Sequence, residues 1–467
     1  MREKYESLPV TQLKEVAKAR GLKHLSGLKK AELVELMLAE DEKDAEKKKT
    51  EETKESNTAD STANNTENTV REAKSTETND DKNAVPDMIR EDLDSGITVE
   101  GILEVMPDGY GFIRSDNYLP GDRDVYVSPS QIRKFNLKTG DIINGNTRIK
   151  TQQEKFSALL YVNNINGVHP SIVQKRKAFE DLTPIFPDER IRLEQQGASV
   201  AMRIVDLVSP IGKGQRGMIV SQPKAGKTTL LKQVAKAVTE SNPDMHMIIL
   251  LIDERPEEVT DIKEAIEGEN VEVIYSTFDE LPEHHKRVSE MVIERAKRLV
   301  EHHKDVMILL DSITRLARAY NLTVPPSGRT LSGGLDPAAL HMPKRFFGAA
   351  RNMREGGSLT ILATALVDTG SKMDDVVYEE FKGTGNMELV LDRKLSEKRV
   401  FPAIDIVKSG TRREDLLLDK EEQEAVDIMR KAFNGARSDD AVESVLNMFA
   451  RTRNNKEYIQ LVKKTRL

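Results

Sequence analysis

One segment constrains the fold of this chain more than any other: the ten residues from Ser221 to Leu230. They read Ser-Gln-Pro-Lys-Ala-Gly-Lys-Thr-Thr-Leu and follow an apolar run at residues 217–220. A strand, a loop ending in Gly-Lys-Thr and a helix are typical of a P-loop, whose backbone amides cradle phosphates at the helix N-terminus. The general pattern has glycine where this chain has Ser221, but the strand and the helix on either side still predict a nucleotide site.

Two residues of this loop carry specific chemistry. Lys227 is suited to neutralise β- and γ-phosphate oxygens, and the Thr228 hydroxyl is suited to bind Mg²⁺. Two further strands are predicted to end in acids: Glu254, a candidate general base for the attacking water, and Asp311, the expected holder of Mg²⁺ through water. Either acid alone would fit a helix cap or an arginine pair, but together with the P-loop they favour ATP hydrolysis.

Four continuous apolar runs predict strands of a parallel sheet, because such strands are buried on both faces by helices. In these sheets the chemistry lies at the carboxyl ends of the strands. The sequence therefore predicts an α/β domain over residues 190–467, preceded by a connector at 167–189. The four predicted strands are residues 217–220, 247–252, 306–310 and 358–363.

Phosphoryl transfer also needs positive charge on the γ-phosphate, commonly from an arginine across a subunit boundary. Candidate arginines lie in residues 398–403 and 409–413. The residues alone do not choose between these two segments.

Residues 96–166 contain short β-branched and aromatic runs joined by tight turns, which indicates a small β-barrel. A single glycine separates Tyr110 from Phe112, so the two rings should share a face and leave flat room for a base. Tyr126 and Phe156 are candidates to join them. The region has eight basic and eight acidic residues, so nucleic-acid binding here would depend on stacking more than on charge. The alternative is that the rings form ordinary barrel core.

The N-terminal part is predicted to contain a small helical module at residues 1–40 and an acidic disordered linker at 41–95. The linker has 17 acidic and nine basic residues, a net charge of −8, whereas the rest of the chain has 62 basic and 61 acidic residues. Such a composition buries too little apolar surface to offset the entropy of ordering. Lys29 and Lys30 of the module are more typical of a solvated face than of a nucleic-acid contact.

The composition also predicts where the protein works. The chain has no cysteine, which excludes disulfides and thiolate metal sites. No window approaches the ~18 consecutive apolar residues of a membrane span. The N-terminus lacks the apolar core of a secretory signal, so we expect a cytoplasmic protein without a membrane partner.

Several motifs in order resemble the bacterial transcription termination factor Rho family. The resemblance covers residues from about 96 to the C-terminus, with a weaker helical match over the first 40. The motifs are Tyr110-Gly111-Phe112, Tyr126-Val127-Ser128-Pro129-Ser130-Gln131-Ile132, Pro223-Lys224-Ala225-Gly226-Lys227-Thr228, Asp253-Glu254-Arg255-Pro256-Glu257-Glu258, Asp311-Ser312-Ile313-Thr314-Arg315 and Asp368-Thr369-Gly370-Ser371-Lys372.

The resemblance implies a homohexameric ring with an OB-fold (cold-shock-like) barrel that captures cytosine-rich single-stranded RNA, and a RecA-like P-loop ATPase domain that uses ATP and Mg²⁺. It implies RNA polymerase elongation complexes as a partner, and Nus-type elongation factors as further candidates. Arg329 stands where the family often has lysine, which keeps the charge.

Site residues are also carried over by position. The catalytic set is Glu254, Lys227, Arg412 and Arg399, with Arg399 beside Arg412 and both reaching a neighbouring subunit's ATP. The ATP-binding set is Pro223, Lys224, Ala225, Gly226, Lys227, Thr228, Thr229, Arg255 and Phe401, with Phe401 stacked on adenine. The RNA-binding set is Tyr110, Phe112, Arg114, Tyr126, Phe156, Arg329 and Lys372, and the metal set is Thr228 and Asp311.

The first hypothesis is therefore an RNA-stimulated ATPase and 5′-to-3′ RNA–DNA translocase that ends transcription. Two other functions compete with it. A rotary ATPase subunit would have a similar P-loop core, but the aromatic barrel face and the loop cations Arg329 and Lys372 count against it. An RNA-binding protein with a silent nucleotide site would not need the full set of catalytic side chains that this chain retains.

Overall fold

The computed structural model describes residues 93–151, 153–432 and 438–465. The chain separates into two units, residues 1–83 and 84–467, and every described residue belongs to the second. The predicted helical module and the predicted linker up to residue 92 lie outside the described residues. In the part of the chain that is described, no helix is long and apolar enough to cross a membrane.

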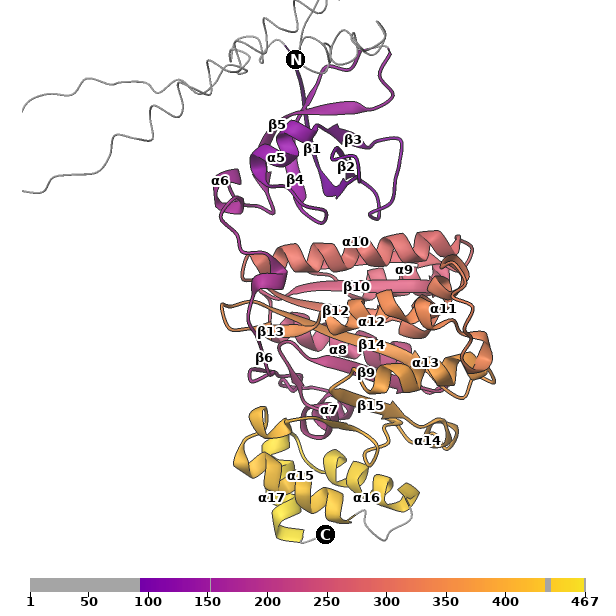
Figure 1. Cartoon of the computed structure of the whole chain (residues 1–467). Helices are drawn as coiled ribbons and strands as arrows, with labels where there is room; N and C mark the ends of the chain where they lie inside the picture. The colour runs from indigo at the N-terminus through magenta and orange to yellow at the C-terminus, as the bar shows by residue number, and fades with distance from the viewer. Residues whose placement is uncertain (1–92, 152, 433–437, 466–467) are drawn as a thin grey trace, which may run out of the picture. The chain divides into compact units, whose positions relative to one another are not determined.

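The first described domain is a closed five-stranded barrel with the strand order β1-β2-β3-β5-β4 (Figure 1). All neighbouring strands are antiparallel except β3 and β5, whose parallel pairing closes the barrel. This topology confirms the predicted OB-fold, and β1 begins two residues before the expected boundary. The elements are β1 (Asp94–Val105), β2 (Gly111–Arg114), β3 (Val125–Val127), α5 (Pro129–Phe135), β4 (Ile142–Arg148) and β5 (Ser157–Ile165).

Side chains that point inward at alternate positions of the strands fill the barrel. Leu103, Ile113 and Ile143 are fully buried in its apolar core. Helix α5 is held at its start by a capping box between Ser128 and Gln131, which satisfies backbone groups that a helix end leaves unpaired. The helix connects β3 to β4 along the chain.

The second domain is built on a sheet with the order β11-β10-β12-β14-β9-β15-β16, parallel except for β16. The four predicted strands are all present in it, each longer than predicted by two or three residues. The strands of this domain are β6 (Pro184–Ile185), β7 (Arg190–Ile191), β8 (Ile211–Gly212), β9 (Arg216–Ser221), β10 (His246–Glu254), β11 (Val271–Thr277), β12 (Asp305–Asp311), β13 (Arg351–Met353), β14 (Ser358–Leu366), β15 (Met387–Leu391) and β16 (Gly410–Thr411).

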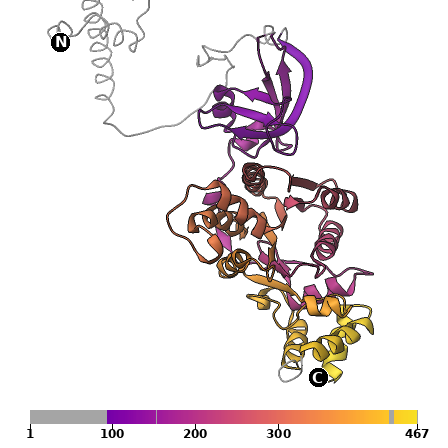
Figure 2. The ribbon, with the colours of Figure 1, turned by 90° about the vertical axis from the view of Figure 1, so that its right-hand side faces the viewer.

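Helices cover both faces of this sheet, as Figures 1 and 2 show. Successive side chains of β10 enter two different cores: Ile249 packs with α8 and α9, whereas Leu250 packs with α10 and α11. This explains why the strands are apolar at every position. The helices are α7 (Val200–Val208), α8 (Lys227–Ser241), α9 (Pro256–Ala265), α10 (Pro282–Glu301), α11 (Ile313–Thr323), α12 (His341–Gly348), α13 (Lys372–Lys382), α14 (Arg393–Glu397), α15 (Lys420–Ala432), α16 (Ser438–Ala450) and α17 (Asn455–Thr465).

The predicted connector is not a plain linker. Its strand β6 pairs antiparallel with β13 and so joins the sheet of the ATPase domain. It also contains two short helical turns, α6 (Pro170–Val173) and η1 (Phe179–Asp181). The remaining 3₁₀ turns are η2 (Ser332–Gly334), η3 (Pro337–Leu340) and η4 (Glu414–Leu416).

Candidate nucleotide-binding and RNA-binding sites

The predicted P-loop lies between the end of β9 and the start of α8. Gly226 precedes the helix with φ of 94°, a left-handed conformation that favours glycine, and no side chain caps the helix there. Lys224 also has a positive φ, of 65°. The free amides at this helix start can bind phosphate. Of the predicted ATP-binding residues, Pro223, Lys224, Gly226 and Thr229 are exposed, Lys227 and Thr228 are half-buried, and Ala225 is buried.

The P-loop lysine is paired with the acid at the end of β12. Lys227 Nζ lies 2.6 Å from Asp311 Oδ1, and the Thr364 hydroxyl donates a 2.8 Å hydrogen bond to the same oxygen. Asp311 is buried. The hydroxyl of Thr228 and this carboxylate supply the hard oxygen ligands that Mg²⁺ prefers, so these residues fit the metal.

Glu254 ends β10 next to this pair and is only 3% exposed. Burial, followed by the negative charge of Asp311, raises the pKa of Glu254 to about 8. Arg315, on α11, donates to the Glu254 carboxylate and holds it in place. The structure therefore brings Lys227, Glu254 and Asp311 together at the carboxyl ends of three parallel strands. Arg255 follows Glu254 and is exposed.

Phe401 is 56% exposed and lies in the loop after α14. That helix contacts the P-loop of its own chain, because Ser396 Oγ donates to the Lys224 carbonyl at 3.2 Å. Arg399 belongs to the same loop as Phe401.

The expectation that Arg399 lies beside Arg412 is wrong. Strand β16 pairs with the first residues of β15, Met387 opposite Thr411, so Arg412 lies at the amino end of the sheet. Arg399 instead follows the carboxyl end of β15, where the P-loop also lies. Between the two arginines the chain runs back along β15, because Ile404 lies opposite Leu391 and Thr411 lies opposite Met387. Arg412 lines a cavity of about 290 Å³ with Lys382, Glu388 and Arg430.

The four predicted aromatic side chains of the barrel form one cluster. Phe112 lies 5.8 Å from Tyr110, 6.1 Å from Tyr126 and 5.2 Å from Phe156, measured between ring centroids. We call these four residues the platform. They are not part of the apolar barrel core around Leu103.

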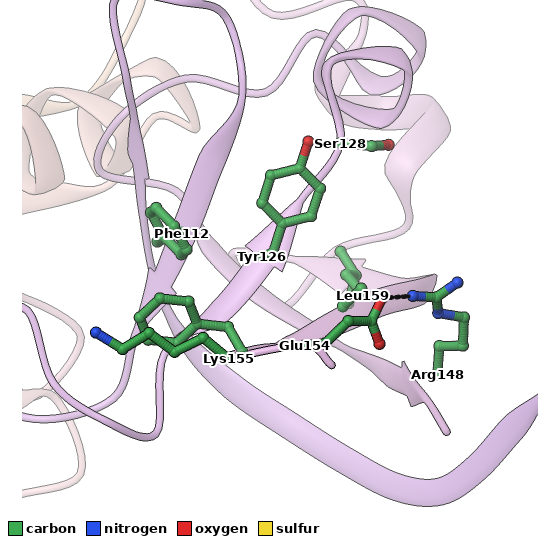
Figure 3. A pocket seen from close by; sticks show the side chains of 9 residues that line it. Phe112, Tyr126, Ser128, Arg148, Glu154, Lys155 and Leu159 are labelled. Atoms are coloured by element: carbon green, nitrogen blue, oxygen red, sulfur yellow. Dashed lines mark hydrogen bonds and ion pairs between the residues drawn. The ribbon is translucent and has the colours of Figure 1, made fainter. Parts of the chain in front are cut away.

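A cavity of about 440 Å³ opens on the platform and is lined by Phe112 and Tyr126 (Figure 3). Three polar residues that the sequence did not single out also line it: Arg148, Glu154 and Lys155. Arg148, the last residue of β4, is paired with Glu154 in the loop that joins β4 to β5. The one feature of the sequence that could have indicated these three residues is that they lie near Phe156 in an otherwise polar loop.

Arg114, predicted to bind RNA, is 5% exposed. It forms ion pairs with Asp124 and, at 2.6 Å, with Glu104. Its guanidinium carbon lies 4.8 Å from the Phe112 ring centroid. The structure thus places Arg114 behind the platform, against one of its rings.

The two predicted loop cations are exposed, and their segments are in contact. Arg329 precedes η2, and Lys372 begins α13. Gly333 of η2 has φ of 78°, and a Cβ at this position would be 2.5 Å from the Met373 nitrogen. Only glycine allows the Arg329 loop to approach the start of α13 so closely.

Comparison with known proteins identifies both domains. Residues 99–171 match the family described as Rho termination factor, RNA-binding domain, and residues 201–411 match the ATP synthase alpha/beta family, nucleotide-binding domain. Among solved structures, a type III secretion system ATPase has a TM-score of 0.52 at 20% identity, covering 68% of this chain and 94% of that one. At that identity the likeness shows the fold alone.

Curated relatives are much more similar. Transcription termination factor Rho of Bacillus subtilis is 55% identical over 374 residues, which is 80% of this chain and 86% of that protein. Rho of Escherichia coli is 55% identical over 371 residues, covering 78% and 88%. With this identity over most of both chains, and with an RNA-binding domain that rotary ATPase subunits do not explain, the chain belongs to the transcription termination factor Rho family.

Proposed function

We propose that this RNA-binding, ATP-dependent termination factor works as a homohexameric RNA–DNA helicase that moves 5′ to 3′ along the transcript. The observation that carries the proposal is that one chain combines a nucleotide site with an aromatic platform and two exposed loop cations. The platform would capture cytosine-rich single-stranded RNA by stacking, at ~1–3 kcal/mol per base. Arg329 and Lys372 would follow the phosphate backbone without reading bases.

Hydrolysis would use the side chains assembled around the P-loop. Lys227 would leave Asp311 for the phosphates, and Glu254 would orient and deprotonate the attacking water. Thr228 and Asp311 would hold Mg²⁺, which neutralises phosphate charge when bound. Phe401 would stack on adenine at the edge of the P-loop.

The arginine finger, which places positive charge on the γ-phosphate, would come from a neighbouring subunit. Arg412 lies at the amino end of the sheet, away from its own P-loop, and this placement supports a role in trans. Arg399, in the loop beside its own P-loop, is the weaker candidate. The elongation complex of RNA polymerase is the expected target in the cytoplasm, with Nus-type factors as additional partners.

ATP hydrolysis measured with no nucleic acid, with cytosine-rich RNA and with DNA of the same sequence tests the proposal. We expect near-background turnover until RNA is added, and release of a DNA strand annealed 3′ to the RNA-loading site. Equal stimulation by DNA, or full turnover without nucleic acid, would contradict it.

A further inference from the structure

The loop that joins the two platform strands reaches the ATPase sheet. It runs from β2, which carries Phe112, to β3, which carries Tyr126. The Arg114–Asp124 ion pair joins the two ends of this loop and is buried. Displacement of either platform strand must therefore move the loop.

The tip of this loop is bound to β11, the edge strand of the sheet. Asn117 Nδ2 donates to the Tyr275 carbonyl at 2.6 Å, and the Tyr275 N–H donates to Asn117 Oδ1 at 3.1 Å. One side-chain amide thus pairs with both backbone groups of Tyr275, as a neighbouring strand would. Asn117 has φ of 46°, a conformation that asparagine tolerates better than most residues.

The next residue strengthens this attachment. Tyr118 is 8% exposed, and its hydroxyl donates to Glu272, also on β11. Glu272 in turn is paired with His246 of β10 and Arg295 of α10. The loop tip is therefore anchored in a partly buried polar cluster.

Strand β11 leads directly to the predicted catalytic base. It is parallel to β10, and Thr277 lies opposite Glu254 in their register. The Phe278 N–H donates to the Glu254 carbonyl at 3.1 Å. Phe278, which makes this hydrogen bond, is the third residue after Tyr275, which Asn117 holds.

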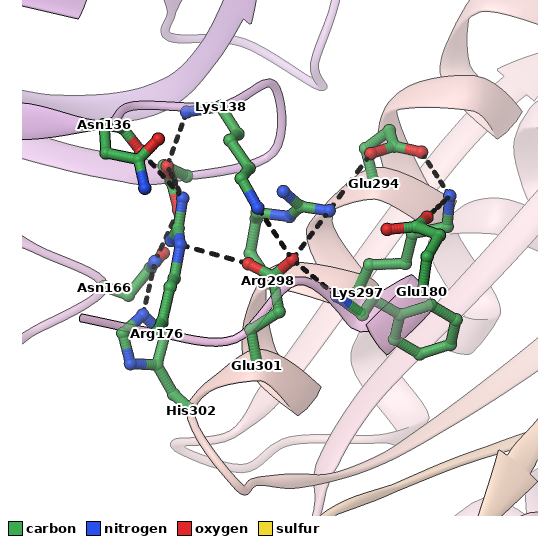
Figure 4. A network of polar contacts seen from close by, with 12 residues as sticks. Asn136, Lys138, Asn166, Arg176, Glu180, Glu294, Lys297, Arg298, Glu301 and His302 are labelled. Atoms are coloured by element: carbon green, nitrogen blue, oxygen red, sulfur yellow. Dashed lines mark hydrogen bonds and ion pairs between the residues drawn. The ribbon is translucent and has the colours of Figure 1, made fainter. Parts of the chain in front are cut away.

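The barrel and the ATPase domain make other contacts as well. Arg287 of α10 donates to Glu104 at 2.7 Å, and Glu104 pairs with Arg114 behind the platform. Figure 4 shows Glu301 of α10 accepting contacts from Lys138, at 3.2 Å, and from Arg176, at 3.1 Å. Arg176 also pairs with Asp141 at 2.5 Å. This network attaches the barrel to α10, as the Arg287–Glu104 pair also does, whereas the Asn117 loop attaches the platform strands to β11.

We propose that Asn117 is a positioning residue that couples RNA capture on the platform to the strand carrying Glu254. The inference rests on the proposed RNA-stimulated ATPase. Coupling between two sites is typically worth a factor of about 5–150. Asn117 touches neither RNA nor ATP in this scheme, and it acts through Tyr275.

Two variants of the full-length protein test the coupling. Asn117→Gly removes the amide but keeps the left-handed backbone, and Asn117→Asp keeps the size but loses the donor to the Tyr275 carbonyl. For both we expect affinity for a cytosine-rich oligonucleotide, measured without ATP, within about twofold of wild type. RNA-saturated ATPase should fall at least about fivefold, with RNA-free turnover unchanged. Asp122→Asn, an exposed substitution in the same loop, should behave as wild type.

The outcomes separate the alternatives. Full RNA stimulation in both Asn117 variants would show that the contact only fastens the barrel, and would overturn the proposal. Parallel loss of RNA affinity would do the same, by showing that Asn117 supports the platform itself. Failure of the proposed function is seen separately, as absence of RNA stimulation in the wild-type protein. Thermal unfolding of each variant verifies that the fold is intact.

Discussion

The platform and the nucleotide site differ in how complete they are within one chain. The four platform rings are already clustered beside a cavity. In the nucleotide site, by contrast, Lys227 is paired with Asp311, and Glu254 is paired with Arg315. Stacking on preformed rings needs little rearrangement, whereas hydrolysis requires these internal pairs to open around ATP. We expect RNA capture to work in a single subunit and catalysis to depend on ligands and neighbours.

The largest expected effect concerns that dependence on neighbours. Arg412→Ala should lower RNA-stimulated turnover by ~10³–10⁵, the usual contribution of an arginine finger. Mixing it with Lys227→Ala subunits should restore some activity, because an interface can then combine an intact finger with an intact P-loop. No recovery of ATPase after verified subunit exchange would contradict the assignment in trans.

The next prediction separates binding from chemistry inside the nucleotide site. Glu254→Gln should lower turnover by ~10²–10⁴, since it removes the general base while keeping the size of the side chain. ATP binding, measured by equilibrium titration, should persist, whereas Lys227→Ala should weaken it. Normal hydrolysis by the Glu254 variant would require another carboxylate as the base.

Loss of RNA binding by the platform should leave the nucleotide site intact. Replacing Tyr110 and Phe112 together with Ala should weaken RNA binding by ~2–6 kcal/mol, from ~1–3 kcal/mol for each stacked base. Saturating RNA should recover part of the ATPase through Arg329 and Lys372. As the contrasting variant, Lys372→Ala should abolish stimulation and leave RNA capture intact. A folded double variant with normal RNA affinity would place capture elsewhere.

The smallest effect is a pH dependence. A general base works in its ionised form, and the pKa of Glu254 is raised to about 8, mainly by burial. Activity should therefore be lost as the pH falls through this value. Between pH 7 and pH 9, kcat/KM for ATP should rise about tenfold, because the ionised fraction rises from roughly one in eleven to roughly ten in eleven. A flat profile over this range would show that another group limits the free enzyme.

The parts of the fold that repeat a simple pattern were predictable from the sequence. Strands buried on both faces have to be apolar throughout, so β9, β10, β12 and β14 stand out. Strand β4 does not, because it contains Asn144, Gly145 and Asn146. Gly145 is required there by close approach, since a Cβ would lie 2.1 Å from the Tyr161 carbonyl oxygen. That contact comes from β5, far along the chain, and leaves no local signal.

In the candidate sites, too, residues with a local sequence pattern were predictable, and those that depend on distant contacts were not. Lys227, Glu254 and Asp311 each end or follow an apolar strand, so their meeting could be predicted from the topology of a parallel sheet. The separation of Arg399 from Arg412 depends on the antiparallel return along β15, which no spacing reveals. The burial of Arg114 depends on two acids, on β1 and at the start of β3.

The pairing of Asn117 with Tyr275 also bears on solubility. An edge strand with free N–H and C=O groups is a template for strand addition by another chain, which leads to aggregation. The Asn117 side chain occupies these groups at Tyr275 of β11, and the Tyr118 hydroxyl donates to the Glu272 side chain of the same strand. Loss of the loop would therefore expose the edge of β11. We expect self-association through this edge before the sheet itself loses stability.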